Sequence, residues 1–134
     1  MKNTRIDRQQ LLNLKDLEDS LGENILLEMS TLYELDYADS ISKMKDYLRK
    51  KDYENLSKYA HKLKSPSGNL GMVKIYYFCL DMEREGKNLN KTYPYSQCID
   101  SIEQEWMFFK NLFKIWEYRI PHDVLSIDIF GETK

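Results

Sequence analysis

The sequence predicts an all-α protein, an up-down-up-down antiparallel four-helix bundle with a short N-terminal capping helix. Apolar residues recur at spacings of three and four in four long segments, which is the period of an amphipathic α-helix. Short stretches of turn residues separate these segments, and the chain has only five glycines and three prolines. Long amphipathic helices joined by short turns pack as antiparallel neighbours.

Composition and charge narrow the classes of function. The 134 residues fit one domain, which we place at 1–134, with the bundle at about 20–120 and a C-terminal tail at 121–134. The 20 basic and 22 acidic side chains leave a net charge of −2, which gives no signal for nucleic-acid or membrane binding. The N-terminus lacks the apolar segment of a secretory signal, and the longest apolar run, 75–80, is too short to span a bilayer. We therefore expect a cytoplasmic protein. We also expect it to be a monomer.

The first fifty residues predict a short helix followed by a long one. Four leucines indicate the short capping helix, namely Leu11, Leu12, Leu14 and Leu17. The sequence Ser20–Glu23 has the capping-box pattern, which predicts that the long helix starts near residues 20–24. This helix is expected to end near Lys50, and its apolar stripe occupies positions 26, 29, 33, 37, 41, 44 and 48.

The second long helix carries His61, one of only two histidines in the chain. Asp52 is suited to cap its N-terminus, and the pattern runs to about residues 67–69. Pro66 has no amide hydrogen and its ring crowds the preceding turn. We therefore expect this helix either to kink just after His61 or to end early.

The last two helices follow a tight turn at Asn69 and Gly71, residues that tolerate positive φ. The third helix is expected to end near 85–86, and its inner face carries Met72, Ile75, Cys79 and Met82. Pro94 suits the first turn of the fourth helix, and Pro121 is expected to end it. Its seam indicates a packed core and occupies positions 95, 99, 102, 106, 109, 113, 116 and 120.

Several kinds of site are not indicated by the sequence. Cys79 and Cys98 lack metal-ligand spacing and fall on or beside predicted core faces, so we expect free, buried thiols. Metal sites in bundles use inward Glu-x-x-His pairs, and the chain has none. It also lacks a phosphate-cradling glycine loop and a nucleotide-binding kinase module. We expect no metal, no cofactor and no ATP-dependent kinase activity of its own.

His61 is the residue on which the functional interpretation depends. With about 100° per residue in an ideal helix, His61 lies roughly opposite the apolar Leu63, so its imidazole is expected to face outward. Lys64, Ser65 and Gly68 follow three, four and seven residues later and line the same ridge. An exposed histidine alone is more often an ordinary surface residue. This ridge, however, offers an accessible imidazole, a nearby cation and room for another protein to approach.

These residue types suit phosphoryl transfer. A neutral imidazole is a nucleophile near neutral pH, because its unperturbed pKa is about 6.5, and it can hold a phosphoryl group as a phosphoramidate. Phosphoryl transfer needs mainly in-line positioning and charge neutralisation. Lys64 can supply positive charge to the phosphoryl oxygens, while Ser65 and Gly68 keep the surface low for a partner's carboxylate.

The residues around His61 resemble the core motif of the histidine-containing phosphotransfer (HPt) family, roughly Ala-His-x-Leu-Lys-Gly/Ser followed by small residues and Leu-Gly. The matching residues are Ala60, His61, Leu63, Lys64, Ser65, Asn69, Leu70 and Gly71. The similarity covers about residues 14–118. It includes 17–23 upstream and, downstream, Ile75, Phe78, Cys79, Met82 and Glu83.

This resemblance implies a phosphorelay intermediate rather than an enzyme. His61 would accept a phosphoryl group from a receiver-domain aspartate and pass it to another receiver, and Lys64 would stabilise the phosphate. The implied partners are response-regulator receiver domains, including those of a hybrid histidine kinase, and they would bring the Mg²⁺. The residues expected to border the partner are Ser57, Ser65, Gly68, Glu83 and Lys87.

Alternatives remain at this point. The same bundle could act as a non-catalytic adaptor that binds receiver domains or a histidine kinase, which would not require both His61 and Lys64. Eight basic and three acidic residues lie between Lys43 and Lys64. This basic stretch either complements an acidic receiver or is an ordinary solvated face. Lys87 is likewise either a phosphate contact or a solvated lysine.

Overall fold

The computed structural model describes residues 4–117, with side chains up to Lys114. Within this part of the chain there is no strand beyond a single antiparallel bridge between Ile6 and Met72. The structure therefore confirms the prediction of an all-α protein. The five helices are α1 (Arg8–Leu21), α2 (Ile25–Arg49), α3 (Tyr53–Asn69), α4 (Val73–Lys87) and α5 (Tyr95–Glu117).

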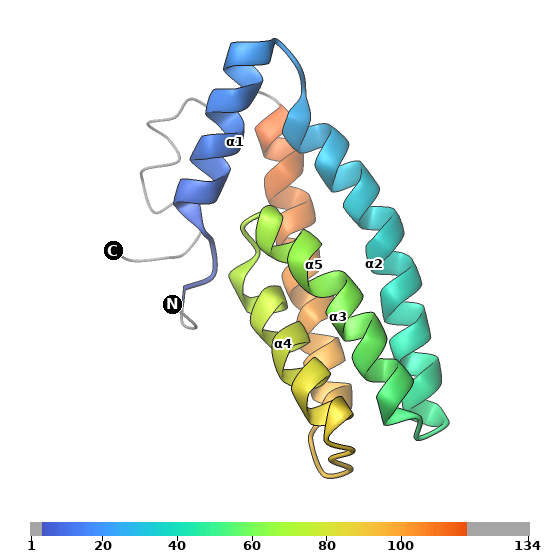
Figure 1. Ribbon diagram of the computed structural model, residues 1–134. Coiled ribbons are helices and arrows are strands. Elements are labelled where there is room, and N and C mark those ends of the chain that lie inside the picture. The colour runs from blue at the N-terminus through green and yellow to red at the C-terminus, as the bar shows by residue number, and fades with distance from the viewer. Residues whose placement is uncertain (1–3, 118–134) are drawn as a thin grey trace.

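The four longer helices lie side by side, and α1 lies at one end of them (Figure 1). The most extensive contact between two helices joins α3 and α4, followed by the contact between α2 and α3. α5 packs against both α2 and α4, so the contacts close a ring in the order α2, α3, α4, α5. α3, which carries His61, is therefore supported on two sides.

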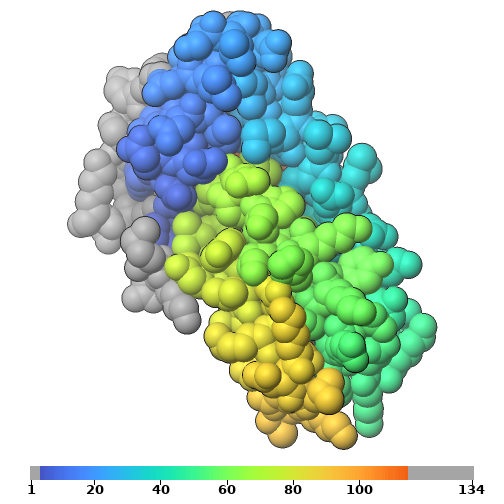
Figure 2. Space-filling view, viewed as in Figure 1, coloured from blue at the N-terminus to red at the C-terminus, as the bar shows by residue number. Residues whose placement is uncertain are grey.

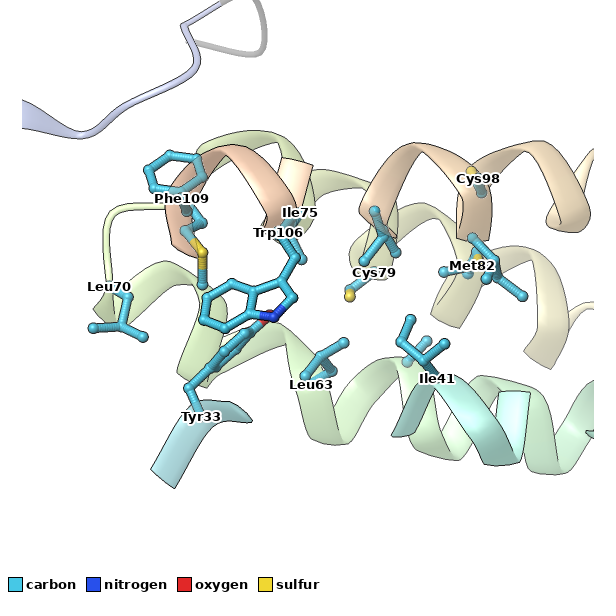
Figure 3. Close-up of a cluster of buried hydrophobic side chains, with 14 of the residues drawn as sticks. Tyr33, Ile41, Leu63, Leu70, Ile75, Cys79, Met82, Cys98, Trp106 and Phe109 are labelled. Atoms are coloured by element: carbon cyan, nitrogen blue, oxygen red, sulfur yellow. The ribbon is translucent and has the colours of Figure 1, made fainter. Parts of the chain in front are cut away.

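Each of the four longer helices contributes side chains to one core (Figure 3). Tyr33 of α2 packs against Trp106 of α5 with ring centroids 4.8 Å apart. Its hydroxyl lies 2.8 Å from the buried Ser67 Oγ of α3. Most predicted inner-face positions are buried, namely Leu26, Tyr33, Ile41, Met44, Met72, Ile75, Cys79, Met82, Tyr95, Ile99, Ile102, Trp106, Phe109 and Phe113. The predicted seam positions 116 and 120 and the helix end at Pro121 lie outside the described side chains and residues.

The predicted capping box at Ser20–Glu23 is wrong. Ser20 lies inside α1, which ends at a left-handed Gly22 with φ of 68°. α2 starts only at Ile25, and the side chain of its N-cap residue, Asn24, makes no capping hydrogen bond. Instead, the buried Glu18 of α1 accepts a hydrogen bond from the backbone N–H of Leu26 at 2.8 Å. A carboxylate from the preceding helix thus satisfies a free donor of the α2 terminus.

The boundaries of α3 agree with the prediction, but its expected early end does not occur. Asp52 caps the helix by accepting a hydrogen bond from the N–H of Asn55 at 3.2 Å. The helix then continues through Pro66 to Asn69. Gly71 takes the predicted positive φ, 74°, and reverses the chain into α4.

The N-terminal segment closes the α3–α4 turn. The N–H of Asp7 donates to the carbonyl of Gly71 at 2.9 Å, and Ile6 is buried. Arg5 makes two hydrogen bonds to Glu105 of α5 at 2.9 and 3.1 Å and lies over the ring of Phe108. These contacts hold the end of α3 in place.

Two further sequence predictions concern thiols and membranes. Cys79 and Cys98 are free and buried, as predicted, and burial raises the pKa of both thiols, so they stay protonated. Among residues 4–117, no helix combines the length and apolarity needed to cross a bilayer.

Candidate functional site

α3 and α4 form an antiparallel pair, and the site lies on their shared outer face. Figure 2 shows the two helices side by side on the face toward the viewer, α3 in green and α4 in yellow-green to yellow. Three side-by-side positions mark the register, namely Ser57 with Gly86, His61 with Glu83, and Gly68 with Tyr76. The last two pairs are seven residues apart on each helix, or two turns, so they lie on the same side.

His61 is exposed and oriented by a carboxylate. Its side chain is 64 % exposed, and its Nδ1 lies 2.6 Å from Oε2 of Glu83. An ionised carboxylate only accepts hydrogen bonds, so Nδ1 carries the hydrogen in this pair. The neutral ring then has its lone pair on Nε2. The arrangement therefore presents one defined nucleophilic nitrogen.

Glu83 is the centre of the charged network. Only 6 % of the residue is exposed, yet its carboxylate accepts hydrogen bonds from Lys64 at 2.7 Å and from Lys87 at 3.2 Å, in addition to its contact with His61. Burial raises the pKa of Glu83, but the hydrogen bonds from Lys64, Lys87 and His61 outweigh this effect and lower the pKa to about 2. The carboxylate is thus ionised throughout the neutral range.

The side chains of Lys64 and Lys87 differ in exposure. Lys64, the residue predicted to stabilise the phosphate, has a side chain only 18 % exposed, with its ammonium against Glu83. The side chain of Lys87 is 66 % exposed, and its contact with Glu83 is longer. Both ammonium groups contact the same carboxylate as His61, but Lys87 is the more exposed and has the longer contact.

Two residues that the sequence assigned to the partner surface lie inside the contact between α3 and α4. Ser57 is 1 % exposed and donates from Oγ to the backbone carbonyl of Glu83 at 2.9 Å. Glu83 itself is buried, as described above. This corrects the assignment of both, because a partner cannot reach side chains that already fill the space between two helices.

Ser65 and Gly68, the two small residues of the predicted ridge, remain at the surface. Ser65 is exposed, and Gly68 is partly exposed. The ring of Tyr76 lies directly over Gly68, since a Cβ added there would be 3.1 Å from Tyr76 Cδ1. The glycine therefore accommodates an aromatic ring from α4 as well as lowering the surface.

The basic stretch between Lys43 and Lys64 is partly neutralised. Lys45 pairs with Glu103, and both Arg49 and Lys50 pair with Asp46. Together with Lys64, half of its basic residues therefore have an acidic neighbour. This distribution favours an ordinary solvated face over a single strong basic patch.

The family resemblance predicted that Glu83 borders His61 and either hydrogen-bonds near the site or stays solvated. Its burial and its central place in the charged network were missed, although a signal existed. Glu83 is four residues after Cys79 and three before Gly86, so it belongs to the buried stripe of α4. A carboxylate in an apolar stripe needs partners for its charge. That rule could have identified Glu83 as a buried functional group, but not its contact with His61.

The model of the Hpt domain family matches residues 28–105, more than half of the chain, and the chain belongs to this family. Hpt proteins are phosphocarriers rather than kinases, and they interact with receiver domains in phosphorelays. The role of this chain is therefore histidine phosphotransfer in a phosphorelay.

A solved structure supports the fold. Histidine-containing phosphotransfer protein B (HptB) from Pseudomonas aeruginosa PAO1 superimposes with a TM-score of 0.73. The two sequences are 21 % identical, and the match covers 89 % of this chain and 99 % of that chain. No curated protein matches the sequence significantly.

Proposed function

We propose that His61 is the phosphoryl-accepting residue and that its Nε2 takes the phosphoryl group from a receiver-domain aspartate and returns it to another receiver. The observation that carries this proposal is the exposed imidazole whose Nδ1 is held by Glu83 at 2.6 Å. The proposal includes a single domain over 1–134, an up-down-up-down antiparallel bundle, a monomeric state and a cytoplasmic location. Receiver domains of response regulators and of a hybrid kinase are the proposed partners.

The transfer needs no general base from this chain. The lone pair of Nε2 attacks phosphorus, the bond from phosphorus to the aspartate oxygen breaks, and the carboxylate leaves as an anion. Nδ1 keeps its hydrogen, and Glu83 stabilises the positive charge that develops on the ring. A Mg²⁺ ion held by the receiver would neutralise the phosphoryl oxygens from the other side, so no metal is required here.

Two lysines are available for the phosphoryl oxygens. We propose that Lys87 moves to the phosphoryl group, because its side chain is exposed and its contact with Glu83 is the longer one. Lys64 stays on Glu83 and contributes positive charge from a fixed place. Ser65 and Gly68 border the space through which the receiver approaches.

Replacing Lys87 with alanine should slow transfer about tenfold, the size expected when one cation is removed from the transition state, and should leave thermal stability nearly unchanged. Replacing Lys64 should slow transfer and also lower stability, because it leaves the buried Glu83 with one cation fewer. Rapid-quench transfer rates and thermal melts measure both. Lys62→Ala is the control, since the side chain of Lys62 lies over Tyr59 and away from Glu83. A Lys87→Ala rate equal to that of Lys62→Ala would contradict the role of Lys87.

The proposed function is tested by incubating the protein with a phosphorylated receiver domain. The expected result is a label on the protein that is labile in acid and stable in base, as a phosphoramidate is, and that can be chased onto a second receiver. His61→Asn should abolish the label. A label that survives in His61→Asn would overturn the assignment of this residue.

The adaptor alternative gives a different result in the same experiment. An adaptor would bind the receiver without any label, and His61→Asn would bind as well as the original chain. The network around Glu83 argues against it, because binding alone gives no reason to fix the hydrogen on Nδ1 of an exposed histidine.

A further inference from the structure

A cavity of about 220 Å³ opens near the α3–α4 turn. Its walls come from the end of α3, the start of α4 and the segment before α1, and they comprise Asp7, Gly68, Gly71, Val73, Tyr76 and Tyr77. Apart from Asp7 they carry aliphatic or aromatic side chains or none. A cavity of about 150 Å³ with apolar walls can hold a benzene molecule. This one therefore has room for a single aliphatic or aromatic side chain.

The cavity lies on the same face as His61. Gly68 is seven residues from His61 on α3, and Tyr76 is seven residues from Glu83 on α4, so the pair at the cavity repeats the pair at the site two turns away. Seven residues of helix correspond to about 10.5 Å. A standard interface of about 800 Å² per partner covers a circle of roughly 16 Å radius. Any receiver that centres on His61 therefore also covers the cavity.

The walls of the cavity are held in place by close packing. The missing side chain at Gly68 lets the Tyr76 ring lie against α3. Tyr76 and Tyr77 pack edge to face with centroids 5.3 Å apart. A Cβ at Gly71 would lie 3.1 Å from the carbonyl oxygen of Asp7. The N-terminal segment therefore packs closely against Gly71 on one side of the cavity. A preformed pocket loses little entropy when a partner side chain enters it.

The face that carries His61 and the cavity has a charged part and an apolar part. Around His61 it carries Lys64 and Lys87, which suit the acidic phosphorylation site of a receiver. Around the cavity it carries partly exposed Val73, Tyr76 and Tyr77. Tyrosines beside an apolar pocket are typical of the positions that contribute most to a protein interface.

We propose that the cavity binds one apolar side chain of the docking receiver domain and determines which receivers exchange phosphate with His61. The charged part of the face would be shared by every receiver, because all of them present a phosphorylated aspartate. The cavity would distinguish receivers that carry a fitting side chain at the matching place from those that do not. This inference rests on the proposed function and deepens it.

The test fills the cavity and compares two phosphodonors. Val73→Phe adds a ring at the cavity wall, and Leu35→Phe adds one at an exposed position of α2 as the control. Transfer is measured from a phosphorylated receiver domain that exchanges with the original chain, and labelling of His61 is measured separately with phosphoramidate, which needs no docking. Val73→Phe should raise KM for the receiver about tenfold, the loss expected at an interface position of this kind, with kcat and the phosphoramidate rate within about twofold. Leu35→Phe should change neither.

Each other outcome has a meaning. Unchanged KM in Val73→Phe, or an equal rise in Leu35→Phe, would overturn the inference. So would a change of mass in solution without a change of KM, which would make the cavity a contact between copies of this chain. Failure of phosphoramidate to label the original chain would instead count against His61 as the acceptor. If Val73→Phe does not fold, Tyr77→Leu removes part of the wall and should raise KM for the same receiver.

Discussion

Glu83→Gln is expected to lower the rate of phosphoryl transfer about 100-fold while leaving the helices intact, which is the size of effect seen when enzymes lose an electrostatic or tautomer-fixing group. The reason is the direction of the hydrogen bonds in the network. Lys64 can only donate, so a glutamine would turn its amide oxygen toward Lys64. Its NH₂ group would then face Nδ1 of His61, which has to become the acceptor. The hydrogen moves to Nε2, and the nucleophilic lone pair is lost there.

Two measurements check this prediction. Single-turnover transfer from a phosphorylated receiver gives the rate, and ¹⁵N NMR of the imidazole reports which nitrogen carries the hydrogen. The spectrum should change from hydrogen on Nδ1 to hydrogen on Nε2. Glu85→Gln on the same helix is the matched control, because the side chain of Glu85 contacts Asn90 rather than His61. If Glu83→Gln transfers phosphate at the original rate and the hydrogen is still on Nδ1, Glu83 does not determine the tautomer of His61.

Gly86→Ala is expected to destabilise the fold by about 2 kcal/mol. A Cβ at this position would lie 2.7 Å from the carbonyl oxygen of Tyr53 and 2.8 Å from Cβ of Ser57. Since the oxygen belongs to the backbone of α3, the two helices have to separate, and overpacking of this kind costs up to about 3 kcal/mol. Alanine regains about 1 kcal/mol as the better helix former, which is too little to compensate.

Thermal melts measure this effect, and the expected drop in Tm is about 7 °C for a chain of this length. Gly68→Ala is the control, because the nearest atoms to its Cβ belong to the side chain of Tyr76 rather than to backbone, and at 3.1 Å the ring has to shift only slightly. Its stability should change by less than about 1 kcal/mol. Separation of α3 from α4 should also weaken the contact between His61 and Glu83, so Gly86→Ala should slow transfer as well. A Gly86→Ala protein at least as stable as the original would contradict the close approach.

The existence of the helices and the outward direction of His61 could be predicted from the sequence alone. Periodicity is a local property: the stripe from Leu26 to Leu48 and the seam from Tyr95 to Phe113 can be located without knowing what they pack against. The outward direction of His61 follows from the same period, and its exposed side chain agrees. The motif beside it indicates the Hpt family, to which the chain belongs.

Local patterns failed where a neighbouring helix supplied the partner. Ser20–Glu23 has the spacing of a capping box, but α1 continues through Ser20 and its Glu18 caps α2 from the side. Pro66 predicted a kink or an early end, and the early end is wrong, because α3 extends to Asn69 and is supported by α2, α4 and the N-terminal segment. Tertiary contacts summed over a helix outweigh local preferences, which are up to about 1 kcal/mol for most residues and about 3 kcal/mol for a proline inside a helix.

The site shows the same division. The sequence by itself determined an accessible imidazole with small residues beside it, because these lie on one helix within two turns. Only the tertiary structure decided that Glu83 holds Nδ1, that Ser57 and Gly86 let α4 approach, and that a cavity opens beside Gly68. Each of these contacts joins residues about eight to thirty positions apart. Their proximity depends on the register between α3 and α4, which is set by packing across the whole pair and is not visible in the period of either helix.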